Sequence, residues 1–465
     1  MTSAPNPHQP PQSDEFAAPP PTLSETEARA AEIEKNEVHN LLWLEVHQVF
    51  YRIAWIFKTE SVIIPAFVDA MGDGQAWLRG WLPVLNRVGQ SVPPMLYASN
   101  LRDMPQKKYA LFGSTLAMAG PMLALGGAWL IWGATPWLAP LFFLLYFLFF
   151  ATTGINQLAS GTVLGKLIRA EHRGGLLAVS GTFGTIGAST LAWFLLQYWL
   201  SLDPRQGFGY IFLFTGAGFV VAGLLCLPLI EPADEAGQSN PSFFDRLTAA
   251  WRLAHEDHHF RRIAIISMLF ITGQFIFPHY QWLGRQQMGD ANQGFNLMLW
   301  IVVQNLGVGV FSFVFGHMAD RFGNRLVLRI IVVTMTLTPV SALLFTSGWL
   351  GPPENVYWIT FVLLGMMPVG LRTLVNYTLE LNQPEFHPLY VGALSLFQAV
   401  PLVFSPLIGL VMDYFGFPAV FGGVAATVAL GGLLTIDMIE PRQFNELKQP
   451  GGIVTDTLTD KEETL

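Results

Sequence analysis

Charged residues are scarce in this sequence. They make up 12% of its 465 residues, whereas 52% are hydrophobic and 13% are aromatic. The charged share is about half that of an ordinary soluble domain, which is too small to cover the surface of water-soluble domains of this length. The composition therefore excludes a string of soluble domains and favours a protein surrounded mainly by lipid.

The sequence also lacks a cysteine pair and a basic stripe. Cys226 is its only cysteine, so no disulfide can form within the chain. The net charge is −8, and residues 1–40 and 441–465 together carry −7 of it. No stretch remains that could follow a phosphate backbone, so we exclude nucleic acid as a partner.

Motifs for ATP-driven pumping and for channels are missing as well. No Walker-type phosphate loop is present, and no repeat resembles a selectivity filter. The stretch His255-Glu256-Asp257-His258-His259 fits the letters of a zinc motif, which needs both outer histidines on one helix. It lies in a charged loop with no convincing third ligand nearby. We therefore expect no metal, no cofactor and no enzyme activity.

Long apolar runs are abundant instead. A bilayer core about 30 Å thick is crossed by about 20 mostly apolar helical residues. These runs are continuously apolar, without the alternation of a membrane strand, so they predict an all-α membrane protein. Twelve segments qualify: 46–69, 81–100, 109–133, 137–163, 175–200, 207–230, 262–284, 294–317, 326–347, 355–382, 389–412 and 417–439.

Basic residues are divided unevenly between the loops. Twelve spans place both termini on one side, and 18 of the 25 Lys and Arg residues fall on that side. The opposite loops hold only Arg79, Arg205 and Arg285. Lys and Arg in short loops resist translocation, so we predict a multi-pass protein of the cell (inner or plasma) membrane with both termini in the cytoplasm.

The remaining segments define the domain organisation that we predict. Residues 1–45 are rich in proline and polar residues and are expected to form a disordered cytoplasmic tail, with a short helix allowed where Ser24 and Glu27 have capping-box spacing. Residues 441–465 form a second flexible cytoplasmic tail. Residues 231–261 connect two six-helix bundles, 46–230 and 262–440, and an apolar stripe in this connection predicts an interfacial helix.

The two halves look like copies of one unit. The first span reads RIAWIFK from Arg52 and the seventh reads RIAIISM from Arg262. In the fourth and tenth spans, Gly154, Leu158 and Thr162 match Gly370, Leu374 and Thr378 at a constant offset of 216 residues. Two similar offsets in one chain favour a duplicated six-helix unit, so the bundles are expected to be pseudo-symmetric.

One loop resembles a known family signature. The sequence Gly316-His-Met-Ala-Asp320-Arg321-Phe-Gly323-Asn-Arg325, between the eighth and ninth spans, closely resembles the cytoplasmic loop of the major facilitator superfamily. The resemblance implies two six-helix bundles that expose a midplane site alternately to each side. It also implies a gating role for these five numbered residues, with Asp320 facing the helix that Pro388 begins; a plain topology anchor is an equal alternative.

Charges inside the spans are the best functional signal. A charge at the bilayer centre costs about 3 kcal/mol, so such a side chain must face protein or water. Lys58, Glu60 and Arg87 lie within the first two spans, while Arg372, Asn376 and Glu380 form one stripe of the tenth. We predict that these six residues bind substrate or couple ions, with Glu60 as the proton carrier. A buried ion-pair network that only joins helices is the alternative.

Amide side chains form a second set within the spans. Those predicted to line the polar cavity are Asn156, Gln157, Gln274, Gln304 and Asn305. Hydrogen bonds that only connect neighbouring helices would explain them equally well.

We interpret the sequence as a secondary active transporter of a small polar organic solute, coupled to protons and working by alternating access in the lipid bilayer. Three cations against one anion in the spans favour an anionic substrate. The alternatives are a facilitative uniporter for a sugar-like solute and a substrate-sensing receptor built on a transporter scaffold.

Overall fold

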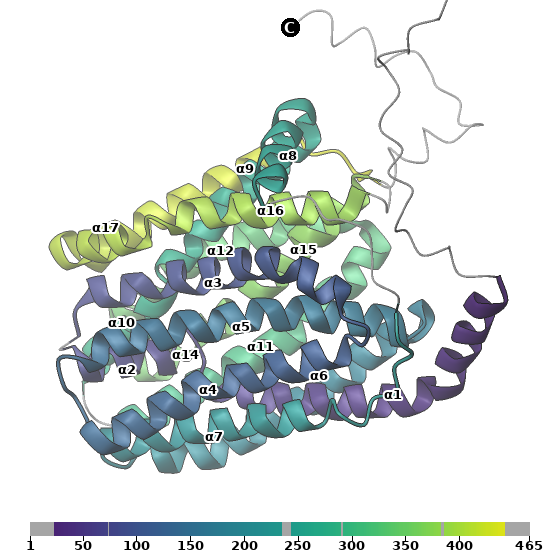
Figure 1. Ribbon diagram of the computed structural model, residues 1–465. Coiled ribbons are helices and arrows are strands. Elements are labelled where there is room, and N and C mark those ends of the chain that lie inside the picture. Colours follow the sequence, from purple (N-terminus) through teal and green to yellow (C-terminus); the bar gives the residue numbers. More distant parts are fainter. Residues whose placement is uncertain (1–22, 73, 235–242, 290–291, 383–385, 442–465) are drawn as a thin grey trace, which may run out of the picture.

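The structure of the chain, a computed structural model, is built from helices. It describes residues 23–72, 74–234, 243–289, 292–382 and 386–441. Within these ranges every regular element is helical, and the long helices lie side by side in a bundle (Figure 1). The predicted all-α fold class is confirmed.

The first half of the chain forms six spans. Its helices are α1 (Leu23–Phe57), α2 (Ile63–Met71), α3 (Ala76–Asp103), α4 (Lys108–Trp132), α5 (Leu138–Leu167), α6 (Ala170–Trp199) and α7 (Pro204–Leu224). α1 and α2 together make the first span. We call the end of the bundle where α1 begins the terminal end, at the right of Figure 1, and the opposite end the distal end.

The second half repeats this plan with more interruptions. Its elements are α8 (Phe243–Glu256), α9 (His258–Ile271), η1 (Thr272–Phe275), η2 (Phe277–His279), α10 (Tyr280–Met288), α11 (Gln293–Phe322), α12 (Asn324–Thr346), α13 (Pro353–Val356), α14 (Trp358–Leu364), α15 (Met367–Glu380), α16 (His387–Leu402) and α17 (Ser405–Leu434). Within α17, Gly416 has φ 78°, and the chain turns there between the eleventh and twelfth spans.

The structure differs from the prediction near the start of the chain and inside several spans. Helix α1 begins at Leu23, so the segment expected as tail through residue 45 is helical from that residue onward. The first span is also not one helix, because residues 58–62 lie between α1 and α2. Residues 442–465, the predicted second tail, lie outside the described residues.

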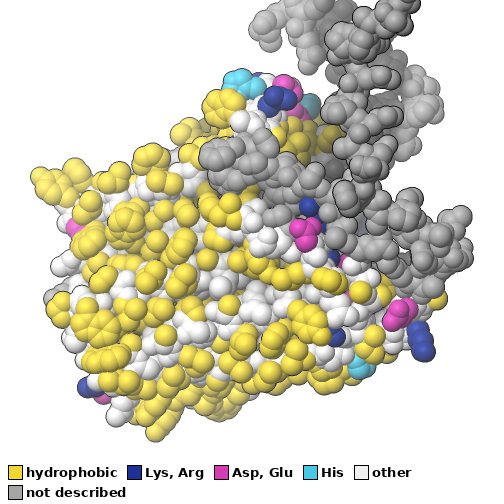
Figure 2. All heavy atoms as spheres, in the orientation of Figure 1, with side chains coloured by type: hydrophobic (Ala, Val, Ile, Leu, Met, Phe, Trp, Pro, Cys, Tyr) yellow, Lys and Arg dark blue, Asp and Glu magenta, His cyan; other side chains and the backbone are white. Residues whose placement is uncertain are grey.

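Hydropathy alone finds nine candidate membrane spans in the described chain. The eleventh and twelfth spans count as one segment, Leu389–Leu434. The first two spans are absent from this set, and both carry buried charged residues, such as Lys58 and Arg79. The sides of the bundle are apolar where Figure 2 shows them. Exposed apolar side chains of the spans include Leu144, Phe313 and Leu433. Such a surface is covered by lipid rather than water, which places the helices across a membrane.

Residues that match at the offset of 216 lie at corresponding places in the two halves, in the fourth and the tenth spans. In α5, Thr162 Oγ1 donates to the Leu158 carbonyl at 2.8 Å. In α15, Thr378 Oγ1 donates to the Leu374 carbonyl, also at 2.8 Å. The first span of each half is interrupted too, after α1 and after α9. The fold is therefore two six-helix bundles, as predicted.

Candidate functional site

The break between α1 and α2 places a buried ion pair inside the first bundle. Lys58 is fully buried and pairs with Glu60. Its ammonium also lies over three aromatic rings, 3.1 Å from the centroid of Trp55, 4.7 Å from Phe149 and 4.8 Å from Phe150. Ring faces attract a cation, so Lys58 is both neutralised and enclosed. Its charge is not available to a solute in this conformation.

Glu60 is more open than its partner. Its side chain is 20% exposed, whereas that of Lys58 is 0% exposed. The neighbouring Ser61 donates a hydrogen bond of 2.5 Å to Gln304 on α11, and this bond joins the two halves. The carboxylate is therefore placed beside the interface of the halves.

Three arginines at membrane depth have neutral hydrogen-bond partners. Arg52 donates to Asn305 Oδ1 at 3.3 Å, and Arg372 donates to Ser312 Oγ at 2.8 Å. Arg87 bonds the side chain of Gln398 and, at 3.4 Å, the carbonyl of Ser395. Among the described residues, no carboxylate lies within 4.0 Å of any of these three guanidinium groups, so their charge is not locally paired.

Several polar side chains of the spans are solvent-accessible. Gln157 on α5 and both Arg372 and Asn376 on α15 are exposed. Gln157 also donates at 3.4 Å to Gln90, which in turn bonds Asn86 on α3. An exposed guanidinium or amide at bilayer depth faces water rather than lipid. Asn86 and Gln90, four residues apart on one helix face, were missed from sequence although their spacing signals a polar stripe.

Other predicted residues are placed differently. Asn156 is buried and donates to Ser114 at 3.1 Å and Thr115 at 2.7 Å, both on α4, so it connects helices within the first bundle. Gln274 is partly buried in η1. Glu380 is partly buried in the last turn of α15.

A polar cluster at the distal end joins the halves and was missed from sequence. Asp69 pairs with Arg79 and accepts a hydrogen bond of 2.6 Å from Gln281, and Arg285 approaches it to 3.6 Å. Arg79 also donates to His279 at 3.2 Å. Arg79 had been assigned to a loop, but it lies in α3 and is only 1% exposed. An acid and a base close to the ends of consecutive spans are the signal that could have revealed this pair.

A cavity of about 390 Å³ lies beside this cluster. Its wall comes from both halves and includes Asp69, Trp199, Trp282, Arg285 and Leu297. Asp413 on α17 adds a further link, because its carboxylate accepts from the backbone N–H groups of Ala76 and Trp77 at 2.9 and 3.1 Å. The distal end is therefore closed by direct contacts between the halves.

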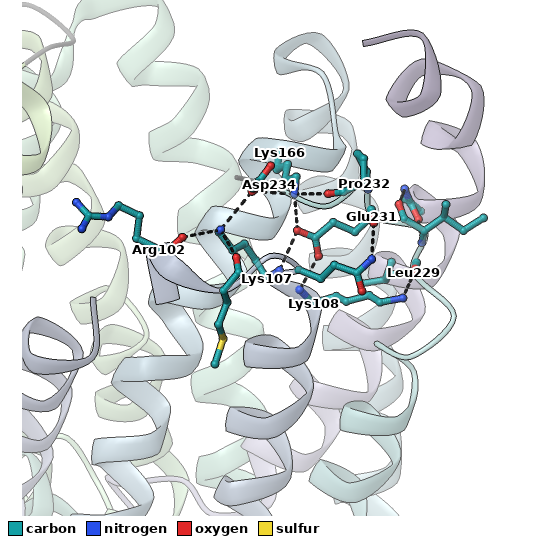
Figure 3. A network of polar contacts seen from close by, with 12 residues as sticks. Arg102, Lys107, Lys108, Lys166, Leu229, Glu231, Pro232 and Asp234 are labelled. Atoms are coloured by element: carbon teal, nitrogen blue, oxygen red, sulfur yellow. Dashed lines mark hydrogen bonds and ion pairs between the residues drawn. The ribbon is translucent and has the colours of Figure 1, made fainter. Parts of the chain in front are cut away.

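The terminal end of the first bundle is held by a separate network, shown in Figure 3. Glu231, which follows α7, accepts hydrogen bonds from the backbone N–H groups of Lys107 and Lys108 at 2.9 and 2.7 Å. Lys166 contacts Glu231 at 2.8 Å and Asp234 at 2.9 Å. The three lysines belong to the first half, and Glu231 and Asp234 begin the connection that follows it. The network therefore stiffens this bundle without joining the two.

Hydrogen bonds in this region lower carboxyl pKa values. Burial raises the pKa of Asp234, but hydrogen bonds and charges from Lys166 and Lys107 lower that pKa by more. Burial likewise raises the pKa of Glu37, and the Arg169 backbone N–H, His172 and the Arg169 guanidinium outweigh it, so the pKa is lowered. Both carboxylates are therefore charged at neutral pH.

The family-like loop lies at the terminal end of the second bundle. Gly316, Asp320 and Arg321 are exposed in the last turns of α11, and Gly323 follows with φ 84°. Arg325 donates to the carbonyl of Met438 at 2.9 Å and lies 3.8 Å from Glu440. Glu440 thus occupies a place in this half like that of Glu231 in the first, and both follow isoleucine and precede proline.

The residues that match the zinc motif do not lie on one helix. Helix α8 ends at Glu256 and α9 begins at His258. Between them Asp257 caps α9, because its carboxylate accepts from the N–H groups of His259 and Phe260 at 2.8 and 2.9 Å. His255 and His259 therefore lack the geometry that the motif requires.

The chain is a membrane protein of two helix bundles with polar residues at their interface. The family model of the Major Facilitator Superfamily matches residues 286–455. A comparison with curated proteins gave no match. The match to the family model covers the second half of the chain and includes the loop from Gly316 to Arg325, which resembles the signature of that superfamily.

Solved structures share its fold at low identity. The nucleoside transporter NupG is similar with a TM-score of 0.69 and 12% identity over 86% of this chain and 99% of that one. A D-xylose–proton symporter gives 0.62 and 15%, covering 86% and 98%. The E. coli fucose:proton symporter FucP gives 0.58 and 15%, covering 87% and 99%. These likenesses establish the twelve-helix, two-bundle architecture.

Proposed function

We propose that this protein is a proton-coupled secondary transporter that moves a small polar organic solute by alternating access. One observation carries the proposal. Gln157, Arg372 and Asn376 are exposed although their helices cross the membrane, and they come from opposite halves. Polar side chains in this position line a water-filled path between the halves rather than a lipid surface.

The contacts described above close one end of the proposed path and leave the other end, in the described part of the chain, without such contacts. The distal end is closed by bonds between the halves, such as that from Gln281 to Asp69. At the terminal end the network of Glu231 lies within one half. We propose that residues 46–230 and 262–440 move as the two bodies and that the described state is open at the terminal end.

Glu60 is our candidate for the proton carrier. It is a partly exposed carboxylate whose partner, Lys58, is fully buried. Protonation of Glu60 would release the ion pair beside Ser61, which bonds Gln304 across the interface. A proton could in this way alter a contact between the halves. The proton symporters among the similar structures support coupling of this kind.

The termini are proposed to be cytoplasmic and the membrane to be the cell membrane. Basic residues gather at the terminal end, where Lys107, Lys108 and Lys166 are described. The positive-inside rule assigns such an end to the cytoplasm. The described state would then be open inward.

Purified protein in proteoliposomes tests this function. The interior carries a pH-sensitive dye, and succinate, glycerol 3-phosphate, xylose and uridine are added in turn under an imposed pH gradient. We expect at least one solute to enter together with protons, and Glu60→Gln to abolish the proton flux while solute binding persists. Solute entry without proton movement would indicate a uniporter. Binding without entry would indicate a receptor and overturn the proposal.

A further inference from the structure

We propose that Arg52 and Arg372 form an anion clamp, which binds the carboxylate or phosphate group of a small organic anion between the two halves. The inference rests on the transport function proposed above and names the substrate class for that site. Three observations support it: the two side chains converge, no acid among the described residues lies near them, and the other central cations are already held by other groups.

The two arginines come from opposite halves and converge on one helix. Arg52 lies in α1 and reaches Asn305, while Arg372 lies in α15 and reaches Ser312. Asn305 and Ser312 are both in α11 and seven residues apart, which is two helical turns or roughly 10 Å. A small anion between these turns could contact both guanidinium groups.

Neither arginine is neutralised by its surroundings. Their hydrogen-bond acceptors are an amide, a hydroxyl and, for Arg372, the Pro368 carbonyl at 3.4 Å. No carboxylate in the described part of the chain lies within ion-pair distance of either group. The positive charge of Arg372 also repels that of Arg52. Uncompensated charge at membrane depth is costly, so its retention points to a ligand of opposite sign.

The other central cations are less suited to this task. Lys58 is paired with Glu60 and covered by the Trp55 ring. Arg87 is held by Gln398, which itself is buried and donates to Ser267 at 2.6 Å. Arg372, by contrast, is exposed, and the planar guanidinium fork matches a carboxylate or phosphate.

The clamp gives the solute a mechanical role. In the empty state the two like charges repel across the interface, which favours separation of the halves at the terminal end. An anion between the arginines replaces this repulsion with two attractions and draws α1 towards α15. A neutral sugar or nucleoside cannot supply this change, so closure around the solute depends on its charge.

Ligand-induced thermal stabilisation and proteoliposome uptake test the clamp. The probes are succinate, glycerol 3-phosphate and inorganic phosphate, with xylose and uridine as neutral comparisons. We expect an organic anion to stabilise the protein, Arg52→Gln and Arg372→Gln each to weaken its binding at least tenfold, and Arg372→Lys to retain part of it. Succinate and glycerol 3-phosphate distinguish a carboxylate from a phosphate ligand.

Arg329→Gln is the matched control, since Arg329 bonds only carbonyl groups, at Thr435 and Ile436, in the described structure. It should leave anion binding unchanged, and all variants should elute as folded protein. Proton-coupled uptake confined to xylose or uridine would overturn the clamp and leave the transport function standing. Anion binding unaffected by Arg52→Gln and Arg372→Gln would overturn the clamp as well, whereas binding without flux of any solute would count against transport itself.

Discussion

Gln281 donates a hydrogen bond of 2.6 Å to Asp69, and this bond joins the second half of the chain to the first at the distal end. Asp69 also pairs with Arg79 of its own half. One carboxylate therefore holds both the local structure around α3 and the contact between the bundles. Its removal should affect the distribution of conformations as well as stability.

Asp69→Asn is expected to open the distal end. The substitution leaves Arg79 buried without its carboxylate, and loss of one partner of a buried pair costs about 3–5 kcal/mol. The distal-open state, in which this region meets water, avoids much of that cost. A cysteine placed at Ala70, which lines the distal cavity, in a Cys226→Ala background should react at least tenfold faster with an impermeant maleimide.

Asp203→Asn provides the control for this experiment. Asp203 is exposed and caps α7 by accepting from the Arg205 N–H at 2.9 Å. Its substitution should leave labelling at position 70 unchanged. Equal labelling rates in the Asp69→Asn and parent proteins would show that the carboxylate does not hold the gate.

Lys58 and Glu60 should be strongly coupled in stability. Either Lys58→Met or Glu60→Gln alone leaves a polar group buried without its partner, whereas the double variant removes both. We expect a coupling free energy of about 1–3 kcal/mol from a double-mutant cycle on unfolding. The partly exposed pair Arg102 and Asp103, 3.5 Å apart, is the control and should give about 0–1 kcal/mol. Equal coupling in the two cycles would contradict the enclosure of Lys58.

Acid should destabilise the terminal end through Asp234. Its pKa is lowered from the ordinary 3.8 in the folded protein, so the unfolded state binds the proton more readily. The stabilising contribution is therefore complete above about pH 5 and disappears as the pH falls through about 4 and below. Asp234→Asn should lower the melting temperature at pH 7 by a few degrees and flatten its dependence on pH in that acid range.

The carboxylate is 33% exposed, so solvent screens part of the effect. Asp103→Asn, which alters a surface ion pair, should leave the dependence of the melting temperature on pH the same as in the parent protein. If the melting temperature of Asp234→Asn changed with pH just as that of the parent protein does, the role of this carboxyl group would be refuted.

The two glycines of the family-like loop should respond oppositely to alanine. Gly323 has φ 84°, which costs about 1–2 kcal/mol for alanine, and a Cβ atom there would lie 2.5 Å from Glu440 Oε1. Gly316 is helical and a Cβ atom meets nothing within 4 Å. Gly323→Ala should lower the melting temperature. Gly316→Ala should leave the free energy of unfolding unchanged or raise it by up to about 1 kcal/mol. Equal changes in stability in the two variants would show that the backbone conformation of Gly323 does not require glycine.

The sequence was sufficient for the fold class because lipid-exposed helices need long apolar runs whatever their neighbours. It was insufficient for the first span, where the helix breaks after Phe57. The ion pair of Lys58 and Glu60 lies in this break, and its aromatic cover comes partly from α5. A short helix near Ser24 was allowed from sequence, but its continuation into the first span was not predicted, because the proline-rich tail was extended through residue 45. Local composition indicates where helices are possible, whereas breaks depend on distant contacts.

The site was predictable as a set of residue types but not as a set of partners. Charge within an apolar run identifies Arg87 and Arg372 as special, since lipid cannot solvate them. Their acceptors, Gln398 and Ser312, come from other helices and leave no trace in the local pattern. Asn156 shows the same limit, because only the folded structure reveals that it points to α4.

Glu231 lies at the terminal end of one bundle and Glu440 at that of the other, each against the loop of its own half. Because these contacts lie within each half, the two bundles can separate at the terminal end without losing them. In the transport cycle proposed above, the energy of each conformational change is therefore set by contacts between the two bundles and not by contacts within them.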